Sequence, residues 1–149
     1  MSTKYDQLLS TVRDYPEFKA QFSSFCETSD KILNDNPHFP GVSFSADSDG
    51  TTAKIRMLDQ TFVVKFHLVA LGDERVGGDA RYGVLGAYLP TQGDEEFLLW
   101  YTFFDIHGNV RDTPDAASAS YSLWDKEFLK KLLGEFTNRY FLHLAKTFK

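Results

Sequence analysis

Apolar and polar residues alternate with a period of two between residues 42 and 104, which is the pattern of strands that bury one face. Turn residues interrupt the alternation at 47–50 and at 59–60. If the chain folds back at both turns, apolar residues meet across the strands: Phe44 beside Ala53, Ile55 beside Val64, and Met57 beside Phe62. The opposite face then carries Ser43, Ser45, Thr52 and Lys54. The alternation therefore predicts antiparallel hairpins with one apolar face.

Two further strands follow, "RYGVLGAYL" at 81–89 and "FLLWYTFF" at 97–104, joined by "PTQGDEE". Gly83 and Gly86 within the first indicate a bulge or the close packing of an aromatic neighbour. Both strands are apolar on both faces, which favours burial on both sides or a partner. Taken in chain order, the strands predict a five-stranded antiparallel meander.

Before the strands, apolar residues fall at helical spacing on either side of Pro16. Proline removes an amide donor and restrains the residue before it. We therefore expect a short helix, a break near Tyr15, and a second helix over about 16–33.

After the strands, Ser122 and Asp125 resemble a capping box. The residues that follow form one apolar stripe: Leu129, Leu132, Leu133, Phe136, Tyr140, Leu144 and Phe148. Gly134 within this long helix suggests a close approach of the backbone to the sheet. The element order predicts an α+β fold, with residues 1–149 forming a single domain.

The length of 149 residues and the 42% hydrophobic fraction suffice for one core. The net charge of -5 makes nucleic-acid binding an unfavoured function, because phosphate would be repelled. Cys26 is the only cysteine, which excludes an internal disulfide and a multi-thiolate zinc site and predicts a small buried hydrophobe. We find no apolar run suited to a signal peptide or a membrane span, so we expect a cytoplasmic protein.

Two motifs invite a chemical interpretation. Asp105 and His107 lie two positions apart, as a general-base pair could, but "DIHGN" is also typical of a strand end followed by a turn. "DSDG" at 47–50 suggests a calcium loop, yet Ser45 and Arg56 would occupy its first and last ligand positions. We favour turns at both places and predict no metal, cofactor or catalytic residue.

Charge patterning indicates two surfaces. Lys54, Arg56, Lys65 and His67 share one face of the first strands, with Lys54 predicted opposite Lys65. That face is either solvated or held open for an acidic partner or anion. The loops at one end of a meander would form an acidic rim. Such a rim either keeps the protein soluble or docks a basic protein. The rim residues are Asp47, Asp49, Asp73, Glu74, Asp79, Asp105, Asp112 and Asp115.

The apolar strand face supplies a third candidate surface. It carries Leu85, Ala87, Leu98 and Trp100. One long helix covers only one side of a sheet, so the second side is covered either by the N-terminal helices or by a partner, including a second copy.

The leading functional hypothesis is a non-enzymatic protein-binding module with an inhibitor, immunity or chaperone-like role. It would dock through the acidic rim or through the apolar face around Leu85 and Trp100. The alternative is a small-molecule-binding protein or enzyme with an aromatic pocket between sheet and helices. That pocket would be lined by Tyr82, Tyr88, Trp100 and Tyr101, with His67, Asp105 or His107 as polar groups.

Overall fold

The computed structural model describes residues 4–35, 39–71, 80–91, 93, 95–111 and 121–148. The elements are α1 (Lys4–Asp35), β1 (Ser43–Ala46), β2 (Thr52–Met57), β3 (Gln60–Leu71), β4 (Ala80–Pro90), β5 (Glu96–Phe104), β6 (Asn109–Arg111), β7 (Tyr121–Ser122) and α2 (Lys126–Thr147). All strands join one antiparallel sheet in chain order. The predicted α+β meander is confirmed. The sheet has seven strands instead of five, because β6 and β7 are too short to show alternation.

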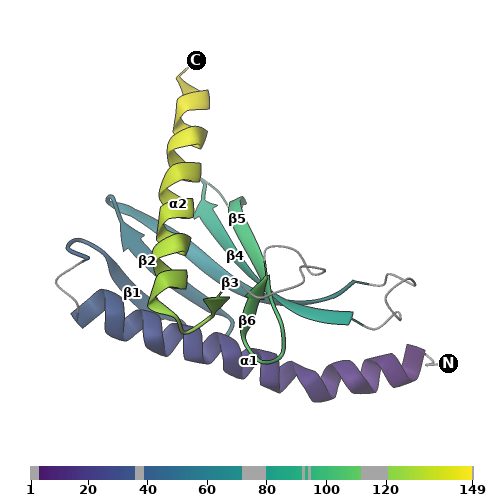
Figure 1. Ribbon diagram of the computed structural model, residues 1–149. Coiled ribbons are helices and arrows are strands. Elements are labelled where there is room, and N and C mark those ends of the chain that lie inside the picture. Colours follow the sequence, from purple (N-terminus) through teal and green to yellow (C-terminus); the bar gives the residue numbers. More distant parts are fainter. Residues whose placement is uncertain are drawn as a thin grey trace.

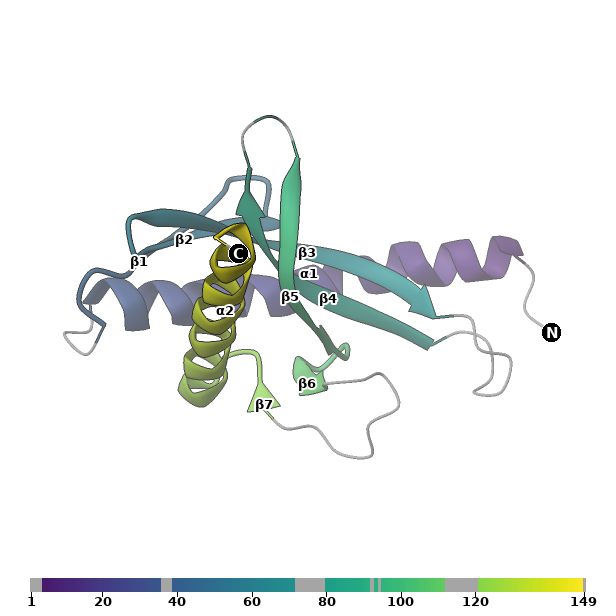
Figure 2. The same cartoon turned by 90° about the horizontal axis from the view of Figure 1, so that it is seen from above.

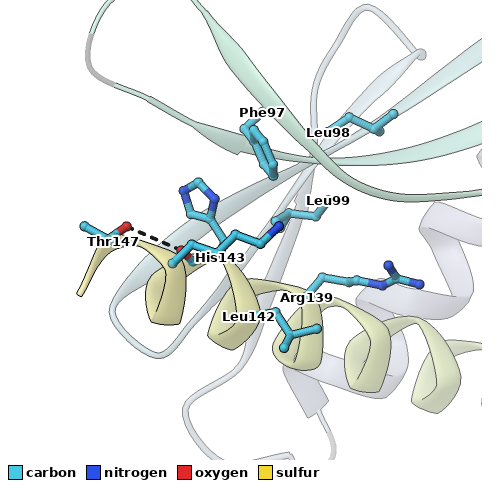
Figure 3. A pocket seen from close by; sticks show the side chains of 8 residues that line it. Phe97, Leu98, Leu99, Arg139, Leu142, His143 and Thr147 are labelled. Carbon is cyan, nitrogen blue, oxygen red and sulfur yellow. Dashed lines mark hydrogen bonds between the residues drawn. The ribbon is translucent and has the colours of Figure 1, made fainter. Parts of the chain in front are cut away.

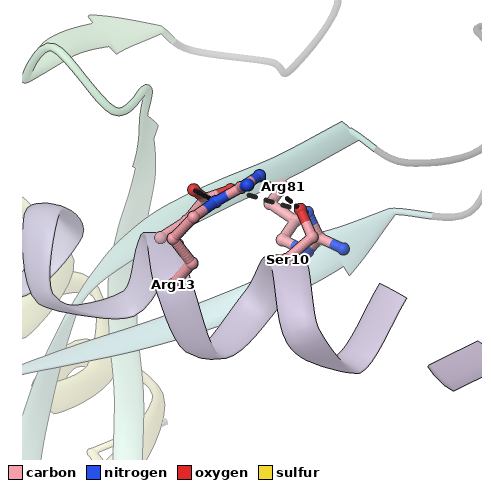
Figure 4. A network of polar contacts seen from close by, with 4 residues as sticks. Ser10, Arg13 and Arg81 are labelled. Carbon is pink, nitrogen blue, oxygen red and sulfur yellow. Dashed lines mark hydrogen bonds and ion pairs between the residues drawn. The ribbon is translucent and has the colours of Figure 1, made fainter. Parts of the chain in front are cut away.

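The predicted break at Tyr15 is wrong, because α1 continues through Pro16 and only bends beneath the sheet (Figure 1). Contacts on both sides of the proline hold the helix in place. On its N-terminal side, Arg81 of β4 donates to the Ser10 hydroxyl at 2.9 Å and lies 3.6 Å from Asp14 (Figure 4). On its C-terminal side, Phe18 is buried in the core. Packing of this kind offsets the cost of about 3 kcal/mol that proline imposes inside a helix.

Each predicted hairpin face is correct, although both registers differ from the prediction by two residues. Phe44 pairs with Ile55, and Ile55 pairs with Phe62. The second turn lies at Leu58 and Asp59, whose φ values of 56° and 57° match the primed turn that suits twisted strands. A shift of two preserves the faces, which explains why alternation alone did not reveal it.

The shift also corrects the predicted charge contact. Lys54 lies opposite Val63, and Lys65 lies opposite Thr52. The ammonium group of Lys65 instead forms an ion pair with Glu96 of β5 at 2.6 Å.

Both helices pack on the same face of the sheet. Phe22 of α1 stacks on Phe66 with ring centroids 5.9 Å apart, and Phe136 of α2 lies 5.8 Å from Phe62. Phe25 of α1 also contacts Phe128 of α2, with ring centroids 6.1 Å apart. Figure 2 shows α1 running along β3, whereas α2 lies at a steep angle to α1. The expectation that N-terminal helices cover the second side of the sheet is therefore wrong. No helix in the described part of the chain packs on that face.

The helix α2 is buried only over its first half. The predicted capping box is wrong, because the N-cap residue is Asp125 and not Ser122, so the helix begins three residues later. The Asp125 carboxylate accepts a hydrogen bond from the Ser122 amide at 2.9 Å just before the helix. The predicted stripe is buried as far as Phe136 and partly buried at Tyr140. Beyond that point the helix projects past the sheet (Figure 1), and Phe148 is 84% exposed.

Two glycines differ in what surrounds them. A Cβ atom at Gly83 would overlap the ring of Phe104, which confirms the predicted close aromatic packing. A Cβ atom at Gly134 would meet no atom within 4 Å, so the predicted close approach of α2 to the sheet there is wrong.

We predict opposite effects of the same substitution at these two positions. Gly134→Ala should raise the free energy of unfolding by about 1 kcal/mol, because alanine favours the helix interior. Gly83→Ala should lower it by about 1 to 3 kcal/mol through overpacking against Phe104. Urea unfolding of both variants checks this, and a stabilised Gly83→Ala protein would show that the ring is not held there.

Candidate functional site

The helix-free face of the sheet gathers most residues of the predicted pocket. His67, Tyr82, Tyr88 and Tyr101 all lie on it. The Tyr88 hydroxyl lies 3.4 Å from Nε2 of His67, and the Lys65 ammonium group lies 5.4 Å from the centre of the Tyr88 ring. These residues therefore form part of an open surface and not a pocket between sheet and helices.

The two predicted apolar docking residues lie on the opposite, helix-covered face. Leu85 is fully buried in the core and is inaccessible to a partner. Trp100 is half-buried and packs against the same core. Leu98, expected to accompany them, lies on the helix-free face because β5 has an irregularity in register opposite Ala87 and Tyr88.

Asp105 and His107 form a turn. The Asp105 carboxylate accepts hydrogen bonds from the backbone amides of His107 at 2.9 Å and Asn109 at 3.0 Å, and it lies 3.6 Å from Arg111. The imidazole of His107 is exposed to solvent. The carboxylate closes the β5–β6 turn, as the turn interpretation predicts.

The predicted acidic rim is only partly described. Asp73, Glu74, Asp79, Asp112 and Asp115 lie outside the described residues. The Asp49 carboxylate accepts from the Thr51 amide at 2.9 Å and the Thr52 amide at 3.0 Å, closing the β1–β2 turn. The hydrogen bond from Thr51 is the main cause of a lowered pKa at Asp49. Asp47 joins the same turn, since its amide donates to the Thr52 carbonyl at 2.9 Å.

The outer edge of β5 is open over most of its length in the described part of the chain. β6 pairs with β5 only at Phe103 and Phe104. Across the ranges that the structure describes, no strand pairs with residues 96–102 on this side. Three large apolar side chains of this segment are exposed, namely Phe97, Leu98 and Tyr101. An open edge with exposed apolar side chains is a template for pairing with another chain.

A groove runs between this edge and the second half of α2. Its volume is about 530 Å³, and its helix side is formed by Arg139, Leu142, His143, Lys146 and Thr147. Figure 3 shows Phe97 of β5 facing His143, with ring centroids 4.5 Å apart. A smaller hollow of about 310 Å³ adjoins it and is lined by residues 98–101 and Arg139. The two hollows share Leu98, Leu99 and Arg139, so together they follow the strand edge.

Sequence reasoning did not identify this groove. The available signal was the spacing of Arg139, His143 and Lys146, which places three basic side chains on one helix face. The chain also has no acidic residue after Glu135. Without the fold, nothing placed this basic helix end beside β5.

Another hollow, of about 570 Å³, lies on the other flank of α2 and is mainly apolar. Its lining includes Phe39, Met57, Leu58, Leu133 and Phe141. None of its described lining residues has a charged side chain that could recognise a ligand.

Cys26 is buried, as predicted, and burial followed by the charge of Glu27 raises the pKa of its thiol to about 12. A thiol of this kind is a poor nucleophile at neutral pH. Among the described residues, no group of three or more His, Cys, Asp or Glu side chains could hold a metal ion. Within the same ranges, neither helix combines the length and apolar character that a membrane span requires.

Comparisons with family models, with curated proteins and with solved structures found no match for this chain.

We predict that Asp105 matters for stability and His107 does not. Asp105→Ala should lower the free energy of unfolding by about 1 to 2 kcal/mol, because two backbone amides lose their acceptor. His107→Ala should change it by less than about 0.5 kcal/mol. Thermal and urea unfolding measure both, and equal losses would contradict the turn assignment.

Proposed function

We propose that this chain is a cytoplasmic, non-enzymatic protein-binding module that docks its partner through β5. The observation that carries the proposal is the exposure of Phe97, Leu98 and Tyr101 on a strand whose outer edge pairs with no other described strand over residues 96–102. Aromatic and aliphatic side chains of this size are typical anchors of protein interfaces. Unpaired backbone groups beside them supply directional hydrogen bonds.

An inhibitor, immunity or chaperone-like role suits such a module, since each requires binding without chemistry. The acidic loop residues remain a second predicted contact, for a basic region of the partner. Both contacts would favour a protein partner over nucleic acid, in keeping with the net charge of -5.

A small-molecule-binding protein is the second candidate. The groove between β5 and α2 supports it, because a volume of about 530 Å³ falls within the range of ligand sites. The groove and the hollow beside it are lined by consecutive residues of β5, which suits an extended chain segment better than a compact ligand.

We predict that a photo-crosslinking amino acid at position 101 captures a protein partner in the source cells, whereas one at position 12 does not. Val12 is a matched control, because it is an exposed apolar residue on α1. Mass spectrometry identifies the captured protein. Tyr101→Lys should reduce recovery of the same partner at least tenfold while thermal unfolding stays unchanged, since Tyr101 is 51% exposed.

The same experiment can contradict the proposal. Equal capture at positions 101 and 12 would show that β5 is not the docking strand. Full recovery of the partner by Tyr101→Lys would have the same meaning.

A further inference from the structure

We propose that the open edge of β5 binds an extended acidic segment of a partner protein, which adds to the sheet as a further strand beside α2. This inference rests on the proposed function and names the chemistry of the partner.

The strand edge supplies the backbone contacts. The Asp105 amide donates to the Asn109 carbonyl at 3.0 Å, on the β6 side of β5. Hydrogen-bonding direction alternates along a strand, so the amides of Phe103 and Tyr101 point the same way. β6 pairs with Phe103 but does not reach Tyr101. Residues 96–102 would extend over roughly 20 Å, which is enough for a peptide of about six residues.

The groove supplies the charge. Arg139, His143 and Lys146 line it, and none of the lining residues that the structure describes carries a side-chain carboxylate. Oε2 of Glu135 lies 3.6 Å from Nε of Arg139, four residues further along α2. An exposed ion pair of this kind contributes little to stability. A basic groove on a molecule of net charge -5 complements an acidic ligand.

The two faces of the edge specify the pattern of the ligand. Side chains of an added strand alternate between the two faces of the sheet. Those on the α2 side would meet Arg139 and Lys146, which favour Asp or Glu. Those on the helix-free side would lie beside Tyr101, which favours apolar residues. The expected ligand therefore alternates acidic and apolar residues.

Charge also argues against a second copy as the occupant. Pairing of two β5 edges about a two-fold axis would bring the basic residues of both α2 helices close together. Like charges placed together in an interface oppose association. An acidic segment from another protein avoids this repulsion.

The test uses heptapeptide arrays in which valine, leucine or tyrosine alternates with Glu, and matched arrays in which Lys or Gln replaces Glu. The full chain should bind the Glu peptides at least tenfold more tightly than the Gln peptides and should not retain the Lys peptides. Binding of the best Glu peptide in solution should weaken as salt rises. N-methylation of alternate amides in that peptide should weaken binding at least tenfold in one of the two alternating patterns.

A charge reversal on α2 localises the site. Arg139→Glu should weaken binding of the best Glu peptide at least tenfold. Lys130→Glu is the matched control, because Lys130 also forms an exposed ion pair, with Glu127, on the same helix. It should leave binding within about twofold, since Lys130 lies outside the groove.

Equal binding of Glu, Gln and Lys peptides, or equal weakening by both charge reversals, would overturn the inference. Light scattering that shows a dimer lost on Arg139→Glu would also overturn it and assign the edge to a second copy. Failure of every Glu peptide, with partner capture at position 101 intact, would reject the acidic strand while the proposed function stands. Peptide binding without any capture at position 101 would remove the proposed function and, with it, the partner that the inference names.

Discussion

The packing of both helices on one face of the sheet is the constraint on which the rest of the structure depends. It is made by phenylalanine rings: Phe22 on Phe66, Phe136 on Phe62, and Phe25 on Phe128. Each buried ring contributes about 1.5 to 3 kcal/mol, whereas a hydrogen bond between neutral groups contributes about 0.5 to 1.5 kcal/mol. The core therefore fixes where α2 crosses the sheet, and so which part of β5 lies beside it.

This arrangement leaves β5 with two different neighbours. Its C-terminal end pairs with β6, while its N-terminal part faces the second half of α2 across a groove. The register irregularity opposite Ala87 and Tyr88 turns Leu98 to the helix-free face, whereas Phe97 faces His143. One short segment thus presents apolar side chains on both faces beside an open backbone edge. A shorter α2 that ended at Tyr140 would lack His143 and Lys146, and so two of the three basic side chains of the groove.

The sequence was sufficient for the fold class, because alternation and helical stripes are local signals that survive a register error of two. It was insufficient wherever tertiary packing decided the outcome. Pro16 predicted a break, yet contacts of Arg81 and Phe18 keep α1 continuous. Gly134 predicted a close approach that does not occur. The Asp105 turn could be predicted from local chemistry, whereas the groove could not, because it joins residues about 40 positions apart in the chain.

Amide hydrogen exchange of the free protein, resolved by residue, tests the open edge of β5 most directly. The Thr102 amide points toward β4, while the Tyr101 amide points away from it. We expect Thr102 to exchange at least a hundredfold more slowly than Tyr101, because only Thr102 requires opening of the sheet. Equal, strong protection of both amides would contradict the account, since it would show that another segment or a second copy already covers the edge.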